Sequence, residues 1–117
     1  MMRRDNVRRD KEIVTRICAQ IIKYLLDRSA ESVSISIVEK GKYEVRIDAK
    51  VSLSIDELNL LKNYLSVGPQ EVGYYYLPLI GEYGSEEDLT IVAMLLDVIE
   101  LNYDERKEEL IVSFRVR

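Results

Sequence analysis

Apolar and polar side chains alternate from Ser32 to Leu53, and this alternation is the most regular pattern in the chain. The apolar positions of its second half are Tyr43, Val45, Ile47, Ala49, Val51 and Leu53. A period of two sends successive side chains of a strand to opposite faces. The polar stretch between the two halves contains Gly41, whose backbone adopts a positive φ at little cost. The pattern therefore predicts a β-hairpin that turns at Gly41 and has one apolar face.

The segment from Asp5 to Arg28 has apolar residues at intervals of three and four instead. They are Val7, Val14, Ile17, Cys18, Ile21, Ile22, Leu25 and Leu26. Polar residues, Gln20 among them, fall mostly between these positions, so the segment is predicted to be an amphipathic helix that lies across the hairpin. Because Cys18 belongs to the apolar stripe, we expect it to be a small buried side chain and not a reactive thiol.

A second helix is predicted to begin at Ser54, directly after the hairpin. Ser54 and Glu57 have the spacing of a capping box, in which each side chain satisfies the backbone N–H group of the other residue. The inward face of this helix is predicted to consist of Leu58, Leu61 and Leu65. Gly68 and Pro69 should end it.

Three adjacent tyrosines, Tyr74, Tyr75 and Tyr76, lie in a segment predicted to be a short helix from Gln70 to Leu77, because Pro78 prevents its continuation. Adjacent positions on a helix point in different directions, so at least one tyrosine must meet solvent, a ligand or a partner. The sequence leaves two interpretations open, ordinary half-buried packing and an interface, where tyrosine is enriched.

A strongly apolar run from Leu89 to Leu96 follows a turn at Ser85–Asp88 that offers a helix cap and acidic residues. The run is apolar nearly all round, which predicts a helix sandwiched between layers and ended by Asp97. Alternation then returns in two segments, 98–103 and 110–116, which predict a second hairpin.

These elements together predict an α+β fold. We expect a two-layer sandwich with an antiparallel or mixed sheet of about four strands in two hairpins, covered on one face by about three or four helices. The sequence leaves open whether the sheet is mixed or has the two hairpins side by side. A chain of 117 residues is predicted to form one domain, 1–117. Residues 1–5 are expected to fray, because basic side chains are unfavourable near a helix N-terminus.

The composition removes several kinds of chemistry. The chain has no histidine and a single cysteine, which excludes histidine-based catalytic systems and internal disulfides, and removes nearly all zinc sites. We therefore expect no catalytic residue and no metal site. No apolar run reaches the roughly 20 residues of a membrane span, and no signal-peptide pattern precedes the first helix. A cytoplasmic protein without a membrane partner is the resulting expectation.

Three stretches resemble the histidine-kinase-like ATPase family. Residues 89–101 resemble the helix and strand that follow its second glycine box, and residues 45–51 resemble the strand that ends in its adenine-binding Asp-x-Gly-x-Gly box. Residues 16–24 can be aligned with its Glu-x-x-x-Asn-x-x-x-His box, which binds magnesium and phosphate. The resemblance implies the fold of that family and a nucleotide site in which Gln20, Asp48, Gly81 and Gly84 are the residual candidates.

The family's chemical positions are altered in this chain. Arg16, Gln20 and Tyr24 stand where the family has Glu, Asn and His, so the general base and a good Mg²⁺ ligand are missing. Asp48 is retained, but no glycine follows it. Carboxylates at residues 86–88 would repel a triphosphate. The resemblance therefore implies a degenerate, anti-sigma-factor-like member without the family's activity.

Three functions follow as hypotheses. The first is a non-catalytic protein-binding or regulatory module, self-associating or bound to a protein partner through Tyr74, Tyr75, Tyr76 and Tyr83. The second is a nucleotide- and Mg²⁺-binding protein or kinase-like enzyme that still uses Asp48, with Glu86, Glu87 or Asp88 holding the metal. The third is a nucleic-acid accessory protein that uses the first eleven residues, where five basic and two acidic side chains give a charge of +3. We favour the first. Acidic residues at a helix start are usually capping and dipole residues and not metal ligands, which disfavours the second. The third lacks a matching basic patch elsewhere and a base-stacking motif in a strand.

Overall fold

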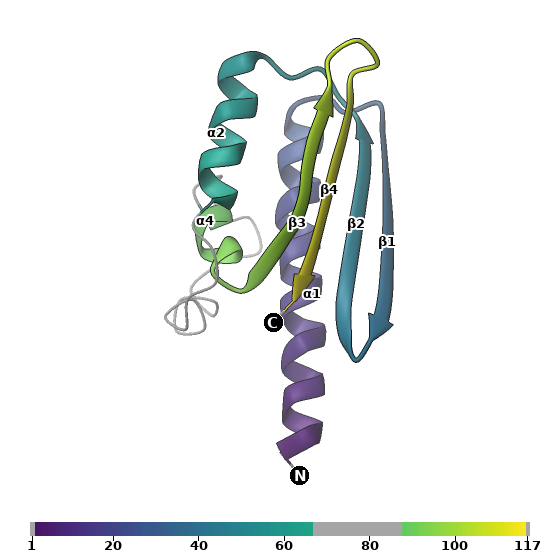
Figure 1. The fold of residues 1–117 in the computed structure, drawn as a ribbon, viewed down its shortest axis with the longest axis vertical. Coiled ribbons are helices and arrows are strands. Elements are labelled where there is room, and N and C mark those ends of the chain that lie inside the picture. The colour runs from purple at the N-terminus through teal and green to yellow at the C-terminus, as the bar shows by residue number, and fades with distance from the viewer. Residues whose placement is uncertain (1, 67–87, 117) are drawn as a thin grey trace.

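The computed structural model describes residues 2–66 and 88–116. In chain order its elements are α1 (Met2–Asp27), β1 (Ser32–Lys40), β2 (Lys42–Lys50), α2 (Ile55–Leu65), α4 (Asp88–Ala93), β3 (Leu96–Asp104) and β4 (Glu109–Val116). The four strands form one antiparallel sheet in the order β1-β2-β4-β3. The helices cover one face of this sheet (Figure 1). The predicted α+β sandwich is confirmed, and the two hairpins lie side by side.

The first hairpin turns where the alternation predicts. Gly41 has a φ of +75°, and the strand pairing closes around it with Lys40 opposite Lys42. A positive φ is strained for any residue with a Cβ atom, so glycine at this position determines the register of the hairpin. Val45, Ile47 and Ala49 of β2 are buried, as the period of two requires.

Helix α2 begins at the predicted capping box. The Oγ atom of Ser54 accepts a hydrogen bond from the N–H group of Glu57 at 3.1 Å, and Oε1 of Glu57 accepts one from the N–H group of Ser54 at 3.0 Å. The buried residues of this helix are Leu61 and Leu65, and Leu58 is partly buried. Helix α2 ends at Leu65 with Ser66 as its C-cap.

Helix α1 begins at Met2, inside the segment for which the sequence predicts fraying, and its first turns extend beyond the end of the sheet (Figure 1). Its buried stripe is wider than the sequence indicates. Gln20 is only 5% exposed and Tyr24 is also buried, whereas Leu26 is exposed. The prediction that Gln20 lies on the polar side of the helix is therefore wrong. The buried face of α1 is centred on Ile17, Ile21 and Tyr24, and Gln20 lies at the edge of that face.

The apolar run from Leu89 to Leu96 does not form a single helix. Helix α4 ends at Ala93, and the chain turns and enters β3 at Leu96, which pairs with Val116. The predicted helix end at Asp97 is therefore wrong. Leu95 and Leu96 are fully buried, one in the turn and one in the strand. A buried helix and a buried strand are both continuously apolar, so the run carries no signal of the change between them.

The core lies between the helices and the inner face of the two central strands. Cross-strand pairs Val45–Phe114 and Ile47–Val112 are buried there. On the helical side the core contains Ile13, Ile17, Ile21 and Leu25 of α1, Leu61 and Leu65 of α2, and Leu89 and Ala93 of α4. Burial of the predicted apolar faces is thus the main source of stability.

A polar junction joins the C-terminal end of α1 to the first turn of α2. The Arg28 guanidinium lies 3.7 Å from the centroid of the Tyr24 ring, and its Nε atom is 3.0 Å from Oε2 of Glu57. The Tyr24 hydroxyl donates a 3.5 Å hydrogen bond to the Glu57 carbonyl oxygen. Because Arg28 stacks on an aromatic ring and pairs with a carboxylate at once, lysine could not replace it equivalently.

Several predictions lie outside the described residues. They are the short helix at 70–77 and the helix cap at Ser85. Helix α2 ends at Leu65, before the predicted end at Gly68 and Pro69, and those two residues also lie outside the described ranges. Among the described helices, none combines the length and the apolar character needed to cross a membrane.

Candidate interaction surface

Strand β1 forms one edge of the sheet, on the side away from α2 and α4 (Figure 1). Within the described part of the chain, its extensive contacts are with β2 alone. Each strand of an antiparallel sheet alternately directs its backbone N–H and C=O groups toward each neighbour, so an edge strand has one row of groups without a strand partner. The outward row of β1 can therefore hydrogen-bond to another extended chain.

The residues Ser32–Val38, which we name the β1 edge, carry no charged side chain and no proline. The apolar side chains at the end of this segment are open to solvent, since Ile37 is 50% and Val38 is 42% exposed. Val33 and Ile35 are partly buried against the core. Over Ser32–Val38, strand β1 therefore has few of the features by which natural proteins protect a sheet edge, and the charged residues Glu39 and Lys40 come only at its end.

The opposite edge of the sheet, β3, is protected. It carries Asp97, Glu100 and Asp104, and its register with β4 shifts between Val98 and Glu100. Charged side chains and bulges both disfavour the addition of a further strand. Helix α4 also contacts β3. The two edges of the same sheet therefore differ in their capacity to accept a partner.

The face of the sheet opposite the helices, which we name the outer face, is polar and carries charges of both signs. Three rows of side chains run across it, each with one residue from β1, β2, β4 and β3 in that order. They are Val38, Glu44, Arg115 and Asp97; Ser36, Arg46, Ser113 and Glu100; and Ser34, Asp48, Ile111 and Asn102.

Two arginines of the outer face are held by carboxylates. Nε and Nη2 of Arg46 donate to Asp48 at 3.1 Å each, and Nη2 of Arg115 lies 2.8 Å from Oε1 of Glu44. The hydrogen bond to Asp48, with the charges of Asp48 and Glu100, raises the pKa of Arg46 above its ordinary value. These charges end at β2, because the β1 positions next to Arg46 and Asp48 are Ser36 and Ser34. The border of the outer face along the β1 edge is therefore uncharged.

The residual nucleotide candidates Gln20 and Asp48 are not brought together. Gln20 is buried on α1, on the helical side of the sheet, whereas Asp48 points to the outer face and pairs with Arg46. The sheet separates them. Tyr24, at the position of the family's histidine, is buried and belongs to the junction with Arg28.

The remaining candidates, Tyr74, Tyr75, Tyr76, Tyr83, Gly81 and Gly84, lie outside the described residues. Within residues 2–66 and 88–116, the structure has no group of three or more cysteine, aspartate or glutamate side chains placed to hold a metal ion. Cys18 is buried, and this burial raises the pKa of its thiol, as expected of a core residue and not of a nucleophile.

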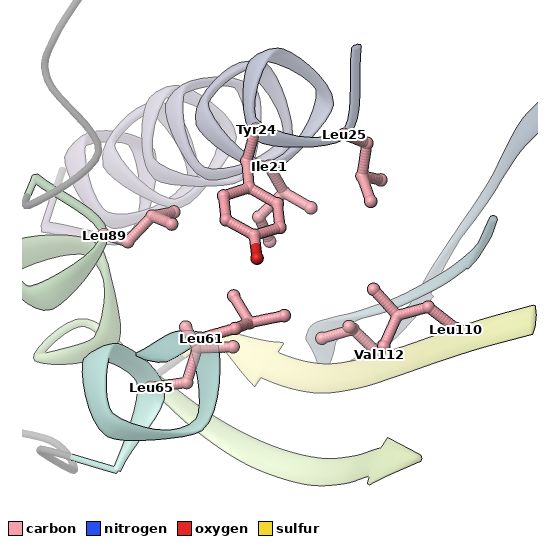
Figure 2. A pocket seen from close by; sticks show the side chains of 8 residues that line it. All are labelled: Ile21, Tyr24, Leu25, Leu61, Leu65, Leu89, Leu110 and Val112. Carbon is pink, nitrogen blue, oxygen red and sulfur yellow. The ribbon is translucent and has the colours of Figure 1, made fainter. Parts of the chain in front are cut away.

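A small cavity of about 10 Å³ lies between the helices and the sheet (Figure 2). Its lining is Ile21, Tyr24, Leu25, Leu61, Leu65, Leu89, Leu110 and Val112. The hydroxyl group of Tyr24 points between α1 and α2 in Figure 2, and every other lining side chain is aliphatic. A space of this size holds at most about one water molecule, which needs two or more polar partners. The cavity is therefore a packing feature and not a ligand site.

Sequence reasoning did not identify the β1 edge as a site, although one signal of it was present. Ile37 and Val38 are adjacent apolar residues in an alternating strand, so they must point to opposite faces, and one of them must lie on the polar face. Val38 does so. Comparisons with protein-family models, with curated proteins and with solved structures find no match to this chain.

Proposed function

We propose that the chain is a non-catalytic protein-binding module that accepts an extended segment of a partner at the β1 edge. The observation that carries this proposal is the difference between the two sheet edges. The β3 edge has acidic residues and a bulge, whereas the β1 edge is uncharged over Ser32–Val38 and exposes Ile37 and Val38. Strand addition provides affinity through backbone hydrogen bonds and specificity through alternate side chains.

The sequence supports the non-catalytic part of the proposal. The chain lacks histidine, and the positions aligned with the magnesium box of the histidine-kinase-like ATPases are Arg16, Gln20 and Tyr24. In this proposal the chain is a degenerate relative of that family that keeps a regulatory, binding role. The tyrosines at 74–76 remain a second candidate surface for the same class of function.

The direct test is binding of a strand-like peptide. A fluorescent peptide with the sequence of residues 32–40 is titrated with the chain, at a concentration where the chain sediments as a monomer. The control peptide has the same side chains but alternate N-methylated amides, which cannot donate ladder hydrogen bonds. We expect saturable binding of the first peptide and at least about tenfold weaker binding of the second, since each lost bond contributes roughly 0.5–1.5 kcal/mol. Equal binding of the two peptides, or binding of neither, would contradict the proposal.

A further inference from the structure

The β1 edge is nearly self-complementary. Around Ile35 its sequence is symmetric in character, with Ser34 and Ser36 on one side of the strand and Val33 and Ile37 on the other. An antiparallel pair of such strands, related by a two-fold axis through Ile35, places Ser34 opposite Ser36 of the second copy. The same axis places Val33 opposite Ile37 of the second copy. Like side chains therefore meet at these two central pairings, as an isologous contact favours, whereas Ser32 comes opposite Val38 at the ends of the β1 edge.

From this symmetry we infer that the partner at the β1 edge is a second copy of this chain, paired strand to strand about Ile35 in one continuous antiparallel sheet. The inference rests on the proposed function, because it needs an edge that accepts a strand. It identifies the partner and fixes the register of the contact. The exposed Ile37 gains an aliphatic neighbour on the helical side, and the uncharged border of the outer face becomes the centre of the joined sheet.

The charges at the ends of the strand are compatible with this register. Glu31 comes opposite Glu39 of the second copy, a repulsive pairing on its own. Nζ of Lys50, however, lies 3.3 Å from Oε2 of Glu31 in the same chain, so a positive charge stands beside this pairing, and both glutamates are exposed to screening by solvent. Between these ends the paired segment contains no charge at all.

Two double variants test both the surface and the register. Ser34 and Ser36 are exposed on the outer face, so changing them leaves the core intact. In the proposed register, S34K/S36K places lysine opposite lysine at both symmetric positions, whereas S34K/S36E places lysine opposite glutamate. Within the chain, position 34 lies next to Asp48 and position 36 next to Arg46. The second variant is therefore compatible with its own sheet as well.

Sedimentation equilibrium of the purified full chain measures the association. We expect the unaltered chain and S34K/S36E to form dimers, and S34K/S36K to associate at least about tenfold more weakly than S34K/S36E. Asn102→Lys, which adds a charge at an exposed position of the β3 edge, should dimerise like the unaltered chain. The inference is overturned if S34K/S36K still dimerises, if S34K/S36E dissociates equally, or if Asn102→Lys weakens the dimer as much.

A measurement on the unaltered chain covers the case in which the variants misfold. Excess 32–40 peptide should reduce the average mass toward that of the monomer, and its N-methylated analogue should not. If the chain binds the peptide but stays monomeric at every concentration, the inference fails while the proposed function stands. If neither peptide binds and the chain still dimerises, both fail, since the contact then lies elsewhere.

Discussion

The hydroxyl group of Tyr103 accepts a 3.0 Å hydrogen bond from the N–H group of Leu53 and donates one of 3.0 Å to the Val51 carbonyl oxygen. Tyr103 lies in β3, whereas Val51 and Leu53 connect β2 to α2. The contact therefore ties the connection between sheet and helix to the opposite hairpin. A neighbouring bond from the Val51 N–H group to the Glu108 carbonyl oxygen, at 2.9 Å, reinforces it.

Replacing Tyr103 by phenylalanine should lower the free energy of unfolding by about 1–3 kcal/mol, because it leaves a buried N–H group without its acceptor. Urea unfolding followed by circular dichroism measures this loss. Tyr43→Phe is the matched control, since no hydrogen bond of the Tyr43 hydroxyl is seen among the described residues. Equal stability of Tyr103→Phe and the unaltered chain would show that the hydroxyl contributes nothing.

Leu61→Ala should enlarge the small cavity of Figure 2 and lower the free energy of unfolding by about 2–5 kcal/mol. Leu60 is the neighbouring residue of the same helix and is 40% exposed. Leu60→Ala should change the free energy by no more than about 0.5 kcal/mol. The urea concentrations at the unfolding midpoints of the two variants test whether Leu61 lies on the buried face of α2 and Leu60 does not. Similar losses of unfolding free energy in both variants would contradict this.

Acid should destabilise the fold partly through Glu57. The hydrogen bonds from the Ser54 backbone and side chain, with Arg28 nearby, lower the pKa of Glu57 in the folded state. The resulting stabilisation is complete above the unfolded pKa of about 4.3 and is lost as the pH falls through the lower folded value. Glu57→Gln retains a capping-box residue but has no carboxyl group to protonate.

The difference in melting temperature between about pH 6 and about pH 3.5 should accordingly be smaller for Glu57→Gln than for the unaltered chain. Differential scanning calorimetry at the two pH values provides the comparison. An unchanged difference would mean that protonation of Glu57 does not contribute to the acid sensitivity.

Millimolar ATP with Mg²⁺ should leave the melting temperature unchanged, because the sheet separates Gln20 from Asp48. A ligand at about 100 times its dissociation constant would stabilise the folded state by roughly 2.7 kcal/mol, a shift of several degrees for this size. Thermal unfolding with and without nucleotide is the measurement. A rise that Asp48→Ala abolishes would restore the nucleotide-binding hypothesis.

Local signals in the sequence were sufficient for the elements with unambiguous periodicity or caps. Alternation and Gly41 predicted the first hairpin, and the Ser54–Glu57 capping box predicted the start of α2. The run from Leu89 to Leu96 failed because complete burial removes the periodicity that distinguishes a helix from a strand.

The candidate site depended on information that is not local. Alternation in Ser32–Val38 is the same in a central strand and in an edge strand. The position of β1 at the edge follows from the pairing of β2 with β4, residues more than half the chain apart. For the same reason the sequence could not indicate that Asp48 and Gln20 lie on opposite sides of the sheet.

The most direct test of the central claim is amide hydrogen exchange in the β1 edge as a function of protein concentration. In a monomer, the outward N–H groups of Ser32–Val38 have no strand partner and exchange quickly, whereas in the joined sheet they are hydrogen-bonded. We predict that their exchange slows as the concentration rises, while the amides of the β3 edge are unaffected. Exchange in Ser32–Val38 that does not change over the range in which the chain dimerises would contradict the account.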